Sequence, residues 1–202
     1  MKPTPVSGTK IRLLSARSLT FAVASSVAIL GPAGSATAEI CHAYDGGQYA
    51  KTRTCVTSVL SPQGRNTYGP GRMSAESDDR GAWCEGATGP GIGQVITLHQ
   101  SPTQKIGSLI VVNGYAKTPQ TFRANGRVKR VQIQTSGGHT TTATLKDTSN
   151  TEVIKIPAAE VSWVRLTILE VYPGNRHSDT CISKLYFDHE EFGALEEPET
   201  SK

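Results

Sequence analysis

The sequence between residues 55 and 187 is a succession of short β-prone runs separated by turn residues, mainly glycine and proline. The candidate strands are residues 55–60, 95–99, 108–112, 128–135, 140–146, 152–156, 161–171 and 181–187. Helical periodicity over a long segment is missing after residue 38. About eight strands joined by Gly/Pro-rich connections predict an all-β protein, a single β-sandwich of the jelly-roll type.

Alternation inside the runs supports this prediction. In the run 128–135, Val131 and Ile133 alternate with polar residues, as expected for a strand with one buried face. Val128 is out of phase with Val131, which predicts a β-bulge near Lys129.

Residues 1–38 have the layout of a secretory signal peptide. Four basic residues precede an apolar run, residues 19–30, and the small residues Ala36-Thr37-Ala38 follow. The apolar run is too short to cross a bilayer of about 30 Å as a helix. We therefore predict cleavage after Ala38, secretion, and no membrane span afterwards; a retained membrane anchor is the alternative.

Removal of this leader changes the charge of the protein. The chain has 21 Lys and Arg against 17 Asp and Glu, but four of the basic residues lie in the leader, so 17 of each sign remain. A formal net charge of zero gives no reason to expect binding to nucleic acid or to an anionic membrane.

All four cysteines, Cys41, Cys55, Cys84 and Cys181, follow the leader, and an even number in an exported protein indicates two disulfides. Zinc is the rival interpretation, but the sequence has no C-x-x-C and no Cys/His pair of the usual spacing. Of the three possible pairings we favour Cys41–Cys55, within an N-terminal segment 39–57, and Cys84–Cys181, which ties a long early loop to the last strand.

Catalytic and cofactor motifs are not recognisable. The glycines of GPGIGQV, residues 89–95, are followed by a β-prone run and not by the helix that a nucleotide-binding loop requires, so no nucleotide and no cofactor are expected. The sequence has no G-x-S-x-G and no H-E-x-x-H. Glu190 and Glu191 adjoin each other in an acidic tail, residues 190–202, and are poorly placed to flank a scissile glycosidic bond.

Seven short motifs follow one another along the chain, each occurring once. They are SPQGRNTYGP (61–70), ESDDRGAWCEG (76–86), GIGQVITL (91–98), VVNGYAK (111–117), NGRVKRV (125–131), VRLTILEVYPG (164–174) and DTCISKLYF (179–187). This set resembles the glycan-binding domain that accompanies the streptococcal type of secreted NAD glycohydrolase, a discoidin-like (galactose-binding-like) jelly roll. The resemblance covers residues 58–187, within a predicted domain 58–189. It implies a non-catalytic carbohydrate-binding module, because in such proteins a separate domain carries the hydrolase activity.

The resemblance also points to residues that contact the glycan. The ligand-binding candidates are Asn113, Tyr115, Lys117, Arg127, Tyr172 and Asp179. An aromatic ring packs on the C–H face of a sugar, and paired donors and acceptors match its hydroxyl groups. The alternative is structural: Asn113-Gly114 forms a turn, and Asp179 ties its loop to backbone amides.

Many domains of this kind hold a structural calcium ion, but the matching positions here differ. Gly81 replaces a hydroxyl residue and Lys184 stands where a glutamate would be, so we predict no metal site. Our hypothesis is that the Lys184 ammonium replaces the ion and pairs with Glu76 or Asp78. The alternative is that Lys184 points into solvent.

The sequence therefore predicts a secreted, non-catalytic module that binds a glycan or polysaccharide. The second interpretation is an envelope-associated structural or protein-interaction domain on the same fold, and a small secreted hydrolase is the third.

Overall fold

A computed structural model describes Met1 and residues 38–45, 51–78 and 80–189. Every helix and strand described belongs to the unit Thr37–Lys202. Nearly all of the predicted leader and the whole acidic tail, 190–202, lie outside the described residues. None of the helices in the described ranges is long and apolar enough to cross a membrane.

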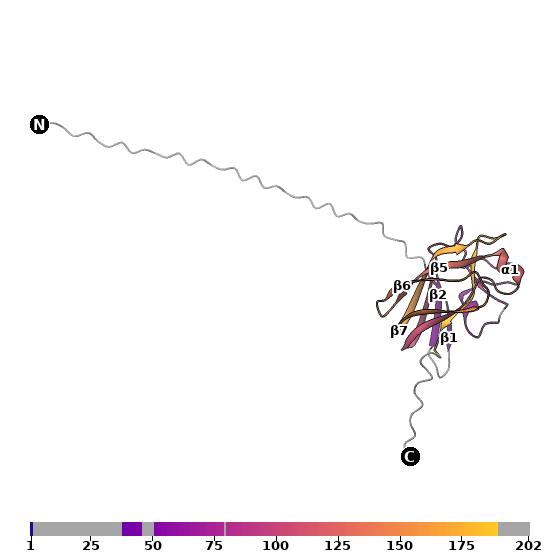
Figure 1. Cartoon of the computed structure of the whole chain (residues 1–202), viewed down its shortest axis with the longest axis horizontal. Helices are drawn as coiled ribbons and strands as arrows, with labels where there is room; N and C mark the ends of the chain where they lie inside the picture. Colours follow the sequence, from indigo (N-terminus) through magenta and orange to yellow (C-terminus); the bar gives the residue numbers. More distant parts are fainter. Residues whose placement is uncertain (2–37, 46–50, 79, 190–202) are drawn as a thin grey trace, which may run out of the picture. The chain divides into compact units, whose positions relative to one another are not determined.

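Strands dominate this unit (Figure 1). In chain order the elements are β1 (Ile40–Asp45), β2 (Lys51–Val56), the 3-10 helix η1 (Pro70–Met73), β3 (Trp83–Cys84), β4 (Val95–Asn113), α1 (Pro119–Ala124), β5 (Gly126–Thr135), β6 (Thr140–Thr144), β7 (Thr151–Tyr172) and β8 (Thr180–Phe187).

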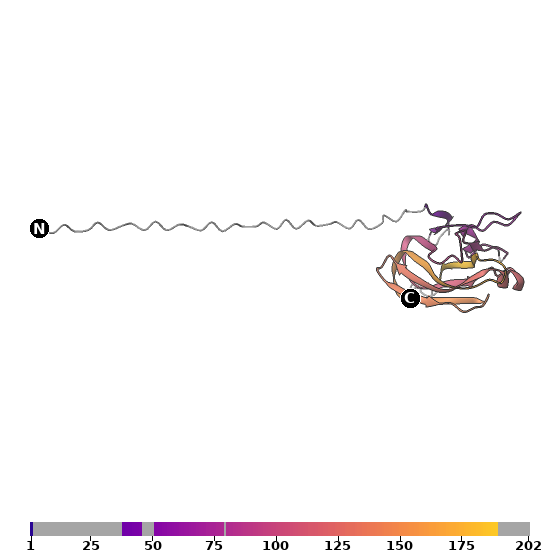
Figure 2. The ribbon, with the colours of Figure 1, turned by 90° about the horizontal axis from the view of Figure 1, so that it is seen from above.

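The eight strands are hydrogen-bonded in the order β1-β2-β4-β7-β5-β8-β3, with β6 added to β5. Strand β4 also pairs with β8, so the path β4-β7-β5-β8 closes on itself. Figure 2 shows the resulting stack of strands in layers. The all-β, jelly-roll prediction is confirmed.

Two pairs of predicted strands merge into single long strands. Runs 95–99 and 108–112 both belong to β4, and runs 152–156 and 161–171 both belong to β7. These two strands pair with each other almost throughout, and the register shifts between His99 and Gln104 and between Ile106 and Ser108. Irregularities of this kind let one strand bend and serve both layers of a sandwich. The intervening polar residues, which resemble turns in the sequence, stay in the ladder.

Burial follows the predicted alternation. In β5, Val131 and Ile133 are buried, whereas Arg130 is exposed and Gln132 and Gln134 are half-buried. The register against β7 shifts on both sides of Arg130. The bulge predicted near Lys129 is thus confirmed. The larger of two apolar clusters contains Trp83, which has no exposed surface, and the smaller one contains Tyr68 and Tyr115.

Both predicted disulfides are present, Cys41–Cys55 and Cys84–Cys181. Each joins directly opposite residues of neighbouring strands, β1 with β2 and β3 with β8. Cys84 and Cys181 are fully buried, whereas Cys41 is exposed. The second bridge fixes the two-residue strand β3, and thereby the end of the long loop before it, to the last strand.

Candidate functional site

A cavity of about 430 Å³ lies beside α1, whose residues form part of its wall. Its walls come from three segments that are distant in sequence, within residues 60–68, 115–125 and 175–179. The volume is within the range of about 300–1,000 Å³ that is usual for small-molecule sites. We call this cavity the loop-end pocket.

Two tyrosines form the inner part of the loop-end pocket. Tyr68 and Tyr115 are only 6% and 7% exposed, and their rings meet edge to face at 6.2 Å and 87°. The Tyr115 hydroxyl donates to the carbonyl of Arg80 (3.4 Å). Burial raises the pKa of both phenols, and the nearby Asp179 carboxylate adds to this at Tyr68. Both tyrosines therefore remain neutral hydrogen-bonding groups on an aromatic wall at physiological pH.

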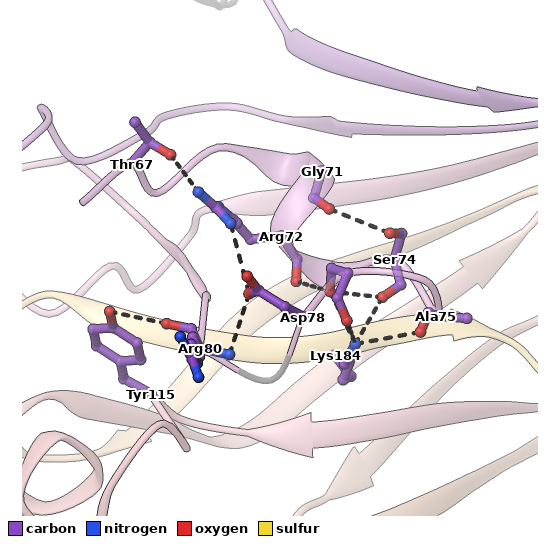
Figure 3. A network of polar contacts seen from close by, with 10 residues as sticks. Thr67, Gly71, Arg72, Ser74, Ala75, Asp78, Arg80, Tyr115 and Lys184 are labelled. Atoms are coloured by element: carbon purple, nitrogen blue, oxygen red, sulfur yellow. Dashed lines mark hydrogen bonds and ion pairs between the residues drawn. The ribbon is translucent and has the colours of Figure 1, made fainter. Parts of the chain in front are cut away.

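A polar network connects the loop of residues 67–78 and Arg80 with Tyr115 (Figure 3). Arg72 donates to the Thr67 hydroxyl at 3.0 Å and forms an ion pair with Asp78 at 3.7 Å. Asp78 in turn accepts from the backbone N–H of Arg80, the residue whose carbonyl holds Tyr115. The loop is thus connected by hydrogen bonds to the pocket wall.

Lys184 anchors the same loop from β8. Its ammonium donates to the carbonyls of Ser74 and Ala75, both at 3.3 Å, and to the carbonyl and hydroxyl of Ser77 (Figure 3). The residue is 9% exposed, so the alternative in which it points into solvent is wrong. The ammonium lies in the loop as a tethered cation would, but these partners are carbonyl and hydroxyl oxygens, and Asp78 pairs with Arg72.

Helix α1 builds a second wall. Thr118 caps it by accepting from the N–H of Thr121 at 3.1 Å, and the Thr121 hydroxyl donates to the carbonyl of Tyr115 at 3.0 Å. Pro119 at the first helical position suits this start, because its missing N–H would have no partner there. The short helix exposes Arg123 in its last turn, on the rim of the pocket.

The connection between β7 and β8, residues 172–180, forms the third wall, and we call it the hook. The backbone N–H groups of Asn175, Arg176 and His177 donate to the carbonyls of Arg123 and Ala124 at 2.9–3.2 Å. A Cβ on Gly174 would lie 2.4 Å from the Ala124 carbonyl oxygen, so only glycine permits this approach. The hook is therefore fixed to the end of α1 and presents its polar side chains outward.

Three of the six predicted ligand residues, Tyr115, Lys117 and Asp179, line the loop-end pocket. The other three have structural contacts elsewhere. Asn113 is fully buried and bridges strands: its amide donates to the carbonyl of Val128 at 2.7 Å and accepts from the N–H of the same residue at 3.0 Å.

Arg127 and Tyr172 are likewise occupied. The Arg127 guanidinium forms two bonds with the Asp147 carboxylate, at 2.9 and 2.8 Å, and donates to the carbonyls of Asn125 and Pro173. The Tyr172 hydroxyl donates to the carbonyl of Leu145 at 3.1 Å. Because these groups hold the ends of strands and loops together, we do not include them in the proposed binding surface.

The sequence analysis missed most of the remaining polar lining. These residues are Gln63, Asn66, Gln120, Thr121, Arg123, Asn175, Arg176 and His177, together with Tyr68. Their signal in the sequence is the dense polar content of SPQGRNTYGP and of the hook, which marks the segments but not the individual side chains.

The arrangement offers an aromatic wall with many hydrogen-bond donors and acceptors, which suits a polar ring-shaped molecule.

Elsewhere in the described residues, Glu39, Cys55 and His99 come close enough to hold a metal ion. Cys55 is in a disulfide, so its sulfur is not available as a thiolate ligand.

Comparison with known proteins identifies the family of this chain. Residues 43–188 match the family described as NAD glycohydrolase translocation F5/8 type C domain. The chain belongs to this family. F5/8 type C domains are discoidin-like, so the resemblance seen in the seven motifs is confirmed.

Solved structures agree on the fold. CpGH89CBM32-5 from Clostridium perfringens, in complex with GalNAc-β-1,3-galactose, is 14% identical with a TM-score of 0.52, covering 67% of this chain and 94% of that one. The CBM32-1 and CBM32-2 domains of ZmpB from the same organism, in complex with GalNAc, reach a TM-score of 0.50 at 11% identity, over 66% of this chain and 32% of that one. The arabinofuranosyltransferase AftD from Mycobacteria also reaches 0.50, at 18% identity, over 67% of this chain and 11% of that one. A comparison with curated protein sequences finds no match.

Proposed function

We propose that this chain is a secreted, non-catalytic carbohydrate-binding module that holds a glycan in the loop-end pocket. The observation that carries the proposal is the pocket itself, in which Tyr68 and Tyr115 lie beneath a rim of amide and charged side chains. This combination matches a sugar, whose C–H face packs on aromatic rings and whose hydroxyls need paired donors and acceptors.

Further support comes from the relatives and from the disulfides. Two of the similar structures were solved with GalNAc-containing sugars bound, on the same fold. Two disulfides and a leader-like N-terminus are typical of exported proteins. Within the described part of the chain, the pocket is lined by a single carboxylate, Asp179, whereas a glycosidase requires a pair of them.

A glycan array with the purified protein tests this function. We expect a restricted set of glycans to bind with micromolar to millimolar dissociation constants, about −8 to −4 kcal/mol. Asn66→Ala, on the pocket rim, should weaken binding, whereas Asn150→Ala, on an exposed loop outside the pocket, should leave it unchanged.

Other outcomes identify the alternatives. An empty array together with capture of one envelope protein at stoichiometric amounts would favour the protein-interaction interpretation. Turnover of a glycoside or of NAD by the purified protein would show that the non-catalytic assignment is wrong.

A further inference from the structure

Positive charge is concentrated on the rim of the loop-end pocket. Lys117, Arg123 and Arg176 line it together with a single carboxylate, Asp179, which leaves an excess of two positive charges. All three cationic residues are exposed, and within the described residues none of them forms an ion pair. Residues 39–189 hold 16 basic and 12 acidic residues, so the domain as a whole is mildly basic and the rim of the pocket carries part of that excess.

Other cations near this end of β5 are paired with carboxylates of the protein, unlike those of the rim. Arg127, four residues after Arg123, is bonded through two nitrogens to Asp147. Lys129 and Arg130 share the Glu170 carboxylate at 3.0 and 2.6 Å, and these two cations lower the pKa of that carboxyl group. The cations of the pocket rim have no such carboxylate partner among the described residues and keep hydrogen-bonding capacity for a ligand.

The backbone under two of these cations is fixed before any ligand arrives. The N–H groups of Asn175 and Arg176 donate to the carbonyls of Arg123 and Ala124, so the hook and the last turn of α1 are joined at the positions that carry the two guanidinium groups. A site whose backbone is already ordered loses less conformational entropy when a ligand binds.

Guanidinium chemistry indicates what such a rim would recognise. Arginine presents a planar fork of donors that matches the paired oxygens of a carboxylate, sulfate or phosphate group. A neutral sugar has only hydroxyls to offer, and for these the amide side chains of the pocket suffice.

We propose that the loop-end pocket selects an acidic saccharide, a sugar that carries a carboxylate or sulfate group facing Arg123 and Arg176 while its ring lies toward Tyr68 and Tyr115. This inference rests on the proposed function and names the class of glycan. Asp179, on the same hook as Arg176, then accepts from a sugar hydroxyl.

Matched pairs of polysaccharides test the proposal, because each pair shares one backbone and differs in charge. The probes are polygalacturonate against its methyl ester, and dextran sulfate against dextran, measured by isothermal titration or affinity electrophoresis. We expect the carboxylate or the sulfate form to bind at least about tenfold more tightly than its neutral partner. Raising sodium chloride from about 0.05 to about 0.5 M should reduce this preference, since salt screens charges near the surface.

Single variants locate the effect. Arg123→Gln and Arg176→Gln should each weaken binding of the acidic probe about three- to tenfold and weaken binding of the neutral probe less, so that the preference for the acidic form shrinks. Arg53→Gln is the matched control, because Arg53 is exposed on β2 outside the pocket. Which acidic pair responds distinguishes carboxylate from sulfate recognition.

The possible contrary results are distinct. Equal affinity for charged and neutral partners, abolished by Asn66→Ala, would overturn the acidic preference while the glycan-binding function stands. An equal loss in Arg53→Gln, or tighter binding of single-stranded oligothymidylate than of either acidic polysaccharide, would overturn the inference by revealing a general polyanion surface. Failure of every glycan on an array of acidic and neutral saccharides would overturn the proposed function and the inference together.

Discussion

The loop end of the β-sandwich uses the same residue types in two different settings. One set is buried and bonded to the protein itself, and the other is exposed on the rim of the loop-end pocket. The matched pairs are Arg127 and Arg123, Asn113 and Asn66, and Lys184 and Lys117. In each pair the first residue has several protein partners, whereas the second faces the pocket.

This difference separates stability from binding. A buried polar group that loses its partner leaves other groups unsatisfied, and each of these costs about 1–3 kcal/mol. An exposed group exchanges its partners for water at little cost, so its removal affects only a ligand that needs it. We therefore expect the buried set to determine the free energy of unfolding and the exposed set to determine affinity.

The two arginine variants should show the largest difference in the free energy of unfolding. Arg127→Gln removes both bonds to Asp147 and leaves the carbonyls of Asn125 and Pro173 without their donor, so the free energy of unfolding should fall by about 3 kcal/mol. Arg123→Gln should change it by less than about 0.5 kcal/mol. Urea unfolding measures both, and equal losses would contradict the distinction.

The two asparagine variants should show the second-largest difference in the free energy of unfolding. Asn113→Ala deprives the N–H and the carbonyl of Val128 of their side-chain partner in the interior, and we expect a loss of about 2–3 kcal/mol. Asn66→Ala should keep the melting temperature and lower only the glycan affinity. If Asn113→Ala melted like the unmodified protein, the buried amide would not be the strand-end clamp described above.

The lysine pair tests the anchored loop. Lys184→Met retains an unbranched apolar stem but removes the ammonium from the carbonyls of Ser74 and Ala75, so we expect a loss of about 2 kcal/mol. Lys117→Met, on the rim, serves as the control for stability.

Since the Lys184 ammonium already satisfies the carbonyl oxygens of Ser74 and Ala75, calcium chloride and EDTA should give the same melting temperature in the unmodified protein. A drop in EDTA would show that a metal ion contributes.

Glu85 should give the smallest effect, one that depends on pH. Burial raises the pKa of its carboxyl group, and bonds from the N–H groups of Ala87 and Thr180 oppose this in part. Because the folded-state pKa lies above the unfolded value, unfolding releases a proton between the two. The stability contributed by this group is therefore complete below the unfolded pKa and is lost as pH rises through the folded pKa.

Glu85→Gln should remove this dependence. The difference in unfolding free energy between the variant and the unmodified protein, measured from about pH 4 to pH 8, should shift in favour of the variant as pH rises. A difference that stays constant over this range would contradict the raised pKa.

The strands were largely predictable because their signal is local. Alternating apolar residues in β5 and the phase change at Val128 correspond directly to the observed burial and bulge. Strand β3 was not predictable in this way, since two residues carry no periodicity and the pairing of Cys84 opposite Cys181 is what defines it. The union of two runs in β4 also depends on its long-range pairing with β7.

The candidate site was predictable only in part. Loop composition drew attention to the right segments, and Tyr115, Lys117 and Asp179 do line the pocket. It did not distinguish Arg127 from Arg176, because both are basic residues beside glycine-containing turns. Their difference is the Asp147 carboxylate, twenty positions away in sequence from Arg127 but 2.8 Å away in space.

The sequence by itself therefore determined the β-sandwich class, its alternating faces and the family, since period-two burial and ordered motifs are properties of neighbouring residues. Only the tertiary structure decided which polar side chains are bonded to the protein and which line the pocket. The reason is that partners such as the Val128 carbonyl for Asn113 and the Ser74 carbonyl for Lys184 come from distant segments, brought within hydrogen-bond reach only when the sheets close.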